Sequence, residues 1–152
     1  MGDPGEPFTG LHGAACLGIV EIFTAVLEME GWDVNAGDCC GSTALIWVAE
    51  RGHEGAVKIL LEQDDINPDQ ADSDWGMMPL MWAAQKGHSG VVKLLLEGDG
   101  VNPDASNHDF DNDTALLLAA EYGHLGVVKI LLEREDVNPN QELSYPSRSL
   151  VF

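Results

Sequence analysis

The sequence predicts an all-α repeat solenoid, in which helix-turn-helix units are stacked and joined by hairpin-like loops. The main observation is a stretch that occurs three times: GHEGAVKILLE at 52–62, GHSGVVKLLLE at 87–97 and GHLGVVKILLE at 123–133. A weaker copy, GIVEIFTAVLE, lies at 18–28, so the period is 34 to 36 residues. Such a period is typical of repeat proteins, in which no unit buries its apolar face alone and neighbours must stack.

Each unit begins with a short helix that the sequence marks at both ends. Thr9, Thr43 and Thr114 stand at the N-cap, where a hydroxyl accepts a hydrogen bond from an early helical amide. In the third unit Met78 has this place and cannot cap, which weakens the helix start by about 0.5–2 kcal/mol. Pro79 follows at the first helical position, where a missing N–H has no cost. A glycine after each short helix is expected to end it.

A longer helix with a broad apolar face follows each glycine, as expected for a helix that packs between two neighbours. These helices are predicted near 19–30, 54–63, 89–97 and 125–134. An acidic, Asn-rich loop comes after each, and three of the four loops carry an Asn-Pro pair that stops the helix. The expected repeats are about 9–41, 42–75, 76–111 and 112–140.

Both ends of the chain fall outside these units. Residues 1–8 are rich in Gly, Pro and acids and are expected to be flexible. Terminal repeats need a polar outer face, so we expect the apolar tail at 141–152 to fold back over the last unit as a cap. End-to-end self-association through an exposed apolar end is the alternative.

Composition restricts the classes of partner. The 152-residue chain has 26 acidic and 7 basic residues and a net charge of -19, which opposes binding to nucleic-acid phosphates and to anionic membranes. It favours a protein partner that is basic or of mixed charge and that offers apolar anchors. No apolar run approaches the roughly 18 residues that span a bilayer. Three cysteines form no disulfide framework, so a reduced, cytoplasmic location is expected, with the nucleus open.

The four units resemble ankyrin repeats. The family's Thr-Pro-Leu-His-x-Ala-Ala pattern is matched by TGLHGAA at 9–15, TALIWVA at 43–49, MPLMWAA at 78–84 and TALLLAA at 114–120. The resemblance covers residues 9–140, and the form GHxGVVKxLLE followed by DVNPD is similar to fungal ankyrin arrays. It implies a non-catalytic module that binds another protein on a concave face of loop tips and short helices, without a cofactor.

One position departs from the family pattern. The family's histidine is present at His12 and is replaced by Ile46, Met81 and Leu117. These replacements predict either apolar packing in place of the usual inter-repeat hydrogen bonds or a surface that is free to contact a partner.

The register of this resemblance identifies candidate partner-binding residues. Trp75 and Phe110 lie near loop tips and Tyr122 ends a short helix, and aromatic anchors inside an acidic rim are typical of interface hot spots. Alternatively, Trp75 and Phe110 only fold the longer loops onto themselves. Trp47 and Trp82 recur in one helical slot, which indicates packing more than binding. The candidate face consists of Cys39, Cys40, Ser42, Glu50, Arg51, Asp74, Trp75, Met77, Gln85, Lys86, Phe110, Asp111, Asp113, Glu121 and Tyr122.

The remaining chemical groups do not indicate an enzyme or a metal site. His53, His88 and His124 recur in register, but equivalent positions of stacked repeats lie about 10 Å apart, too far for one metal ion. Each histidine is therefore expected to bridge its own turn. Cys39 and Cys40 have no basic residue nearby in the sequence to lower a thiol pKa. No catalytic triad pattern or phosphate-binding glycine loop is recognisable.

Two alternatives to a simple binding module stay open. The alternating acids at 109–113 resemble a calcium loop but lack the later Gly and Glu of an EF-hand, and Asp69, Asp72 and Asp74 form a second acidic set. These loops leave a calcium-responsive repeat protein as one alternative. A piece of a larger ankyrin-containing scaffold is the other.

Overall fold

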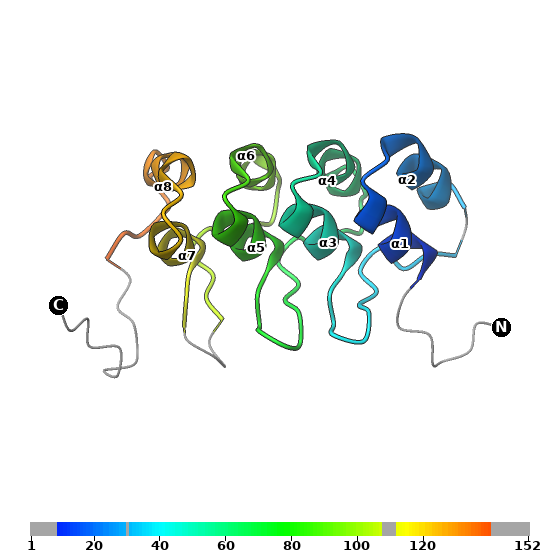
Figure 1. Cartoon of the computed structure of the whole chain (residues 1–152), viewed down its shortest axis with the longest axis horizontal. Coiled ribbons are helices and arrows are strands. Elements are labelled where there is room, and N and C mark those ends of the chain that lie inside the picture. The colour runs from blue at the N-terminus through cyan, green and yellow to red at the C-terminus, as the bar shows by residue number, and fades with distance from the viewer. Residues whose placement is uncertain (1–8, 30, 108–111, 141–152) are drawn as a thin grey trace.

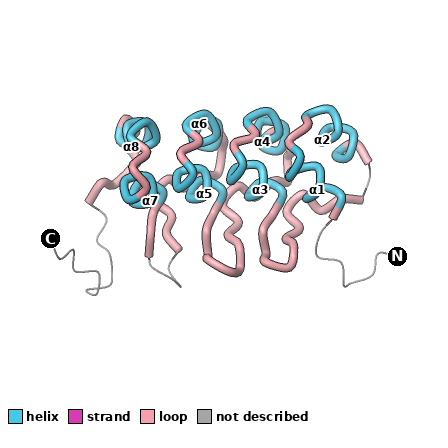
Figure 2. Tube along the Cα trace, in the orientation of Figure 1, coloured by secondary structure: helices cyan, strands magenta, loops and turns pink. Residues whose placement is uncertain are grey.

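The chain forms two layers of helices in the computed structural model, which describes residues 9–29, 31–107 and 112–140. The first layer contains α1 (Gly10–Leu17), α3 (Ala44–Arg51), α5 (Pro79–Lys86) and α7 (Ala115–Glu121). The second contains α2 (Val20–Leu27), α4 (Glu54–Leu61), α6 (Ser89–Glu97) and α8 (Leu125–Leu132). Figure 1 shows the helix pairs side by side, and Figure 2 shows the long loops leaving from the first layer, away from the second. The all-α repeat fold is confirmed.

The predicted helix starts are present. The hydroxyls of Thr43 and Thr114 each accept a hydrogen bond from the amide three residues later, at 3.3 Å. Thr9 meets the ring of His12 instead, with its hydroxyl 2.7 Å and its amide 3.1 Å from Nδ1. Met78 makes no side-chain cap, and the proline after it begins α5, as the sequence predicts.

Small side chains allow the helices of the first layer to lie close together. Alanines occupy the positions where neighbouring short helices meet, and larger aliphatic groups fill the space between the layers. The buried alanines of the first layer are Ala14, Ala15, Ala44, Ala49, Ala83, Ala84, Ala115 and Ala119. The fully buried residues of the second layer are Phe23, Ala56, Val57, Leu60, Val91, Val92, Leu95, Val127 and Leu131. Most of the core is one continuous cluster along the stack, and Met77, Met81 and Leu118 form a second, smaller cluster.

A row of hydrogen bonds joins the loops that follow the second-layer helices. The amide of the Asn in each Asn-Pro pair donates to a side-chain oxygen of the preceding repeat, so every such loop is fastened to its neighbour. The pairs are Asn67 to Asn35 (2.7 Å), Asn102 to Asp69 (2.8 Å) and Asn138 to Asp104 (2.9 and 3.0 Å). The carboxylates of Asp69 and Asp104 therefore belong to the interface between repeats.

The histidines that begin the second-layer helices join repeats as well. His88 Nε2 lies 2.9 Å from the carbonyl oxygen of Glu50, and His124 Nε2 lies 2.8 Å from that of Gln85. Both carbonyls belong to the preceding repeat, so the prediction that each histidine bridges its own turn is wrong for His88 and His124. The ring can reach the preceding repeat because a glycine ends the short helix of that repeat. A Cβ at Gly52, which ends α3, would stand 2.7 Å from the His88 ring.

The position that departs from the family pattern is filled by apolar packing. His12 reaches two carbonyls of the loop before α3, at 3.1 and 3.0 Å. Ile46 and Met81 are 2% and 1% exposed, so they replace these hydrogen bonds with buried contacts. Leu117 is half-buried and lines a hollow of about 370 Å³ over the outer side of α7 and α8. Apolar packing is therefore the alternative that holds at positions 46 and 81.

Several predictions fall on segments outside the described residues. They concern the flexible start at 1–8, the loop tip at 108–111 and the capping tail at 141–152, and they stay predictions. In the described part of the chain, no helix has the length and apolar character needed to cross a membrane.

A matched pair of substitutions tests the glycine–histidine contact. Gly87 and Gly123 both have a left-handed φ, of 79° and 77°. A Cβ at Gly87 would lie 2.5 Å from Nδ1 of His124, whereas one at Gly123 has no described atom within 4 Å. We expect Gly123→Ala to cost about 1–2 kcal/mol for the conformation alone. Gly87→Ala should cost about 0.5–1.5 kcal/mol more, because it also displaces the His124 hydrogen bond. Urea unfolding measures both, and equal losses would show that the contact is unimportant.

Substitution of Asp69 tests the ladder between loops. Burial raises the pKa of its carboxyl, more than the hydrogen bond from Asn102 lowers it. Because the pKa of Asp69 is higher in the folded state, ionised Asp69 lowers the free energy of unfolding. This loss of stability is complete at a pH above the folded-state pKa and disappears at a pH below the unfolded-state pKa. Asp69→Asn keeps an oxygen acceptor without the charge, so it should raise the melting temperature at pH 7. The gain should shrink as the pH falls through the pKa of Asp69, and a gain independent of pH would contradict this.

Candidate functional site

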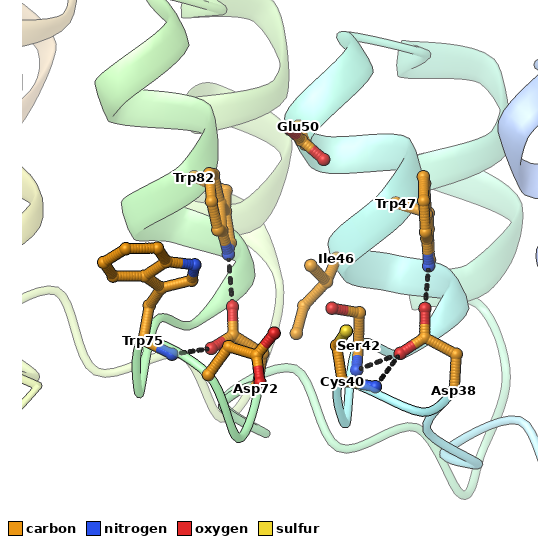
Figure 3. Close-up of a pocket in the computed structure, with 10 residues that line it drawn as sticks. Asp38, Cys40, Ser42, Ile46, Trp47, Glu50, Asp72, Trp75 and Trp82 are labelled. Carbon is orange, nitrogen blue, oxygen red and sulfur yellow. Dashed lines mark hydrogen bonds between the residues drawn. The ribbon is translucent and has the colours of Figure 1, made fainter. Parts of the chain in front are cut away.

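A pocket of about 200 Å³ lies on the first-layer face between the second and third repeats. It is bounded by α3, by α5 and by the loops that precede them, as Figure 3 shows. We call it the tryptophan pocket, and its lining residues are Asp38, Cys40, Ser42, Ile46, Trp47, Glu50, Asp72, Asp74, Trp75 and Trp82. Five of these are residues that the sequence predicted for partner binding.

Asp38 organises the side of the pocket that belongs to the second repeat. Its Oδ1 accepts hydrogen bonds from the amides of Cys40 and Ser42, at 2.9 and 3.0 Å, which closes the loop before α3. Its Oδ2 accepts the indole N–H of Trp47 at 2.9 Å. One carboxylate therefore fixes both the loop and the indole.

Asp72 has the same role in the third repeat and is 5% exposed. Its Oδ1 accepts the amides of Trp75 at 2.8 Å and Met77 at 3.4 Å, and its Oδ2 accepts the indole N–H of Trp82 at 2.8 Å. The two loops are also joined to each other, since the Ser73 amide donates to the Cys40 carbonyl at 2.8 Å. The walls of the pocket are thus held by hydrogen bonds within and between the repeats.

Trp75 is the exposed aromatic of the pocket. Its side chain is 60% exposed and stands beside Trp82, whereas its backbone amide is held by Asp72 (Figure 3). This exposure argues against the alternative in which Trp75 only folds its loop onto itself. Trp47 and Trp82 are half-buried, so their common slot contributes both to packing and to the pocket wall.

Two cations lie over the rings at the edge of the pocket. The guanidinium carbon of Arg51 is 5.3 Å from the centre of the Trp47 ring, and Nζ of Lys86 is 5.8 Å from that of Trp82. Lys86 Nζ also lies 3.9 Å from Oε1 of Glu50. Distances below about 6 Å are those of cation–π contacts. Both basic residues predicted for the face therefore cover tryptophans.

Cys40 lines the pocket, and its thiol lies next to that of the exposed Cys39. Their sulfurs lie 3.8 Å apart, and with an Asp38 oxygen they form a group whose atoms are within 4.8 Å of one another. A hydrogen bond with Asp74 and one with Cys39 raise the pKa of the Cys40 thiol to about 12. Cys40 is therefore a protonated thiol at neutral pH and a weak nucleophile. Asp38 already accepts three N–H groups, so we assign no metal to this group.

Two predicted contact residues are buried, which corrects their assignment. Met77 is 5% exposed and packs against Met81 and Leu118 between the third and fourth repeats. Asp113 is 6% exposed, and its carbonyl accepts the Asn107 amide at the base of the last long loop. Each residue directly precedes the N-cap of a short helix, and its carbonyl accepts an amide from the start of the loop, which closes the loop. Neither is available to a partner.

The other predicted residues are at the surface or outside the described chain. Tyr122 is 54% exposed at the end of α7, one repeat away from the tryptophan pocket. Cys39, Arg51, Lys86 and Glu121 are exposed, and Gln85 is half-buried. Phe110 and Asp111 lie outside the described residues, so their placement on the face stays a prediction.

The sequence analysis missed the aspartates that hold the pocket and the wall provided by Ile46. A signal was present, because Asp38 precedes Trp47 by 9 residues and Asp72 precedes Trp82 by 10, each across a helix start. The pairing of a loop acid with an indole on the next helix predicts a hydrogen bond between them.

This architecture defines a class, the helical repeat proteins that present a loop and short-helix face. A family model of ankyrin repeats, in three copies, matches residues 11–107 and 65–142, and the chain belongs to the ankyrin repeat family. Ankyrin repeats generally mediate protein–protein interaction and are typically non-catalytic. The chain is also similar to the probable E3 ubiquitin-protein ligase XBOS33 of Oryza sativa subsp. japonica, at 45% identity over 51 residues. That match spans 34% of this chain and 10% of the ligase.

Removal of the Asp72 carboxylate tests how the pocket is held. Asp72→Ala should destabilise the fold by about 1.5–3 kcal/mol, since it leaves buried N–H groups without their charged acceptor. The neighbouring Asp74 is exposed, so Asp74→Ala serves as the control and should stay within about 0.5 kcal/mol of the parent. Chemical denaturation gives both values. Equal stability of the two variants would mean that Asp72 is not a structural residue.

Proposed function

We propose that this chain is a non-catalytic interaction module that binds a partner protein on its first-layer face, with the tryptophan pocket as the centre of contact. The observation that carries the proposal is Trp75, a large indole that is 60% exposed at the edge of a pocket with two further tryptophans. Tryptophan is enriched among residues that dominate binding energy at protein interfaces.

The rigidity of the pocket supports this proposal. The loop that carries Trp75 is fixed by Asp72 and by the bond from Ser73 to the preceding loop. A surface that is ordered before binding loses less conformational entropy when a partner arrives. The sequence places further exposed groups along the same face, of which Tyr122 is the largest described.

Electrostatics favours a basic or mixed-charge partner. The chain carries a net charge of -19, and four carboxylates line the tryptophan pocket. Complementary charge steers association and disfavours partners of like charge. Nucleic acids and anionic membranes fall in the disfavoured class. An intracellular, cytoplasmic location fits such a partner and belongs to the proposal.

The calcium alternative has less support than the sequence suggested. Within the set Asp69, Asp72 and Asp74, the first accepts the amide of Asn102 and the second accepts three N–H groups. Calcium would need these oxygens at 2.3–2.6 Å, so it would have to displace bonds that hold the loops. No contact in the described residues favours calcium over these hydrogen bonds.

The hollow over α7 and α8 supports a second, separate contact. It is lined mainly by apolar groups, and its outer wall is where a further repeat would stack. Either the tail at 141–152 covers it or another molecule does, as in end-to-end self-association. A third possibility is that the chain is part of a larger ankyrin-containing scaffold. The ligase activity named for the rice protein is not transferred to this chain.

Loss of one indole tests the proposed face. Trp75→Ala should remove captured partners without a change in the melting temperature, because the side chain makes few buried contacts. Leu125 on α8 is 73% exposed and lies in the second layer, so Leu125→Ala is the matched control. Affinity capture from the source cells followed by quantitative mass spectrometry compares the three baits.

The expected pattern is a set of proteins retained by the parent and by Leu125→Ala and reduced about tenfold or more with Trp75→Ala, as for a hot-spot residue. Retention of the same set by Trp75→Ala would place the binding surface elsewhere. Loss with Leu125→Ala alone would move it to the second layer.

A further inference from the structure

We propose that the tryptophan pocket takes one cationic side chain of the partner, a lysine or arginine that enters between the indoles and is paired with Asp74 and Glu50. This inference rests on the proposed function, since it names the group that the face recognises. It assigns the class of ligand as a basic peptide segment, in which a single positive side chain is the anchor.

The first argument is the number of aromatic faces. Trp47, Trp75 and Trp82 all line one pocket of about 200 Å³, a volume that suits a single long side chain. A cation placed over an indole is attracted by the negative face of the ring, and tryptophan gives the strongest attraction among aromatic residues. Figure 3 shows Trp75 and Trp82 together on one side of the pocket and Trp47 on the next helix.

The second argument is the charge of the lining. It contains four carboxylates, and among the described residues that line it there is no lysine or arginine. Two of these, Asp38 and Asp72, are turned toward N–H donors, and their charge still contributes to the potential of the pocket. Asp74 is exposed and Glu50 half-buried, so both have oxygens available to an incoming ammonium or guanidinium.

A neutral apolar side chain fits this pocket less well. It would take the carboxylates of Asp74 and Glu50 out of water and add no new charge partner to the Cys40 thiol and the long Lys86 contact. Charges that are so weakly paired are costly to desolvate. A cation gains both the ring contacts and the ion pairs. An anion would meet the four carboxylates and be repelled.

Lys86 gives a third argument, because it already makes the predicted kind of contact. Its Nζ lies 5.8 Å from the Trp82 ring centre and 3.9 Å from Glu50. It approaches from the helix end, and at 3.9 Å its ion pair is at the outer limit of such contacts. Lys86 is thus an internal competitor for the groups that would hold a partner's cation.

The experiment uses the whole chain and four synthetic peptides. Each is acetylated and amidated, with uncharged Gly and Ser around one central residue: lysine, trimethyl-lysine, arginine or norleucine. Binding is followed by the indole N–H signals of the four tryptophans in ¹⁵N NMR spectra. Trp32 lies outside the pocket and against Gly10 in the first repeat, so its signal is an internal control.

We expect the three cationic peptides to shift the signals of Trp47, Trp75 and Trp82 in a saturable way and to leave Trp32 unchanged. Norleucine, which keeps the alkyl chain without the charge, should have no effect at the same concentration. Tightest binding of trimethyl-lysine would identify an aromatic cage for methylated lysine, and tightest binding of arginine would identify guanidinium stacking. Equal shifts with norleucine, or shifts of Trp32 equal to the others, would overturn the inference.

Variants give the second readout. The double change Asp74→Asn with Glu50→Gln keeps size and removes two charges, and it should weaken lysine-peptide binding about tenfold. Lys86→Gln removes the competitor and should strengthen binding several-fold. Lys93→Gln makes the same charge change at an exposed lysine of α6 and should have little effect. Equal effects of the two lysine variants would show that only net charge matters and would contradict a specific pocket.

These outcomes separate this inference from the proposed function. One outcome is that no cationic peptide binds and that the double variant of Asp74 and Glu50 still captures the partners that Trp75→Ala loses. The face is then a binding site that does not recognise a cation. If Trp75→Ala loses no partner, the proposed face itself is wrong.

Discussion

The stack depends on one contact, in which a histidine ring lies against the glycine that ends the short helix of the preceding repeat. Only a residue without a Cβ both adopts the left-handed turn at Gly52 or Gly87 and leaves room for the ring. The histidine then satisfies a carbonyl at the end of that helix, where backbone acceptors have no intrahelical partner. One pair of residues therefore ends a helix, caps it and sets the distance to the next repeat.

A second constraint shapes the loops, and the repeats show it by their differences. The backbone amides of Asp38, Asp72 and Asn107 are equivalent, and each donates to the carbonyl of the residue that precedes the N-cap. In the two repeats with aspartate, an indole N–H from the following helix reaches the carboxylate. In the fourth repeat, Leu118 has the place of the indole and the loop residue is the uncharged Asn107. A buried charge is kept where a donor supports it, as desolvation requires.

The fold was predictable from the sequence because its signals are local and recur. Caps, terminating glycines and apolar periodicity each specify a helix end or face, and stacking follows. The direction of the inter-repeat bonds was not predictable, since a histidine at a helix start reads the same whether it bonds its own turn or its neighbour's. The site was found in part. Exposure of Trp75 followed from register, whereas burial of Met77 and Asp113 depends on how the longer loops turn inward, which register does not specify.

The distribution of cations reduces the aromatic surface that this face exposes. Exposed apolar patches promote non-specific association. Arg51 and Lys86 cover Trp47 and Trp82 with charged groups that water solvates. The indole N–H groups of the same two rings donate to aspartate carboxylates. An exposed cation–π contact contributes only about 0.5–1 kcal/mol, so a partner can displace it at small cost. The buried bonds to the carboxylates are stronger and remain in place. The face is therefore weakly covered and firmly supported, as the proposed binding of a partner requires if the loops are to stay in place.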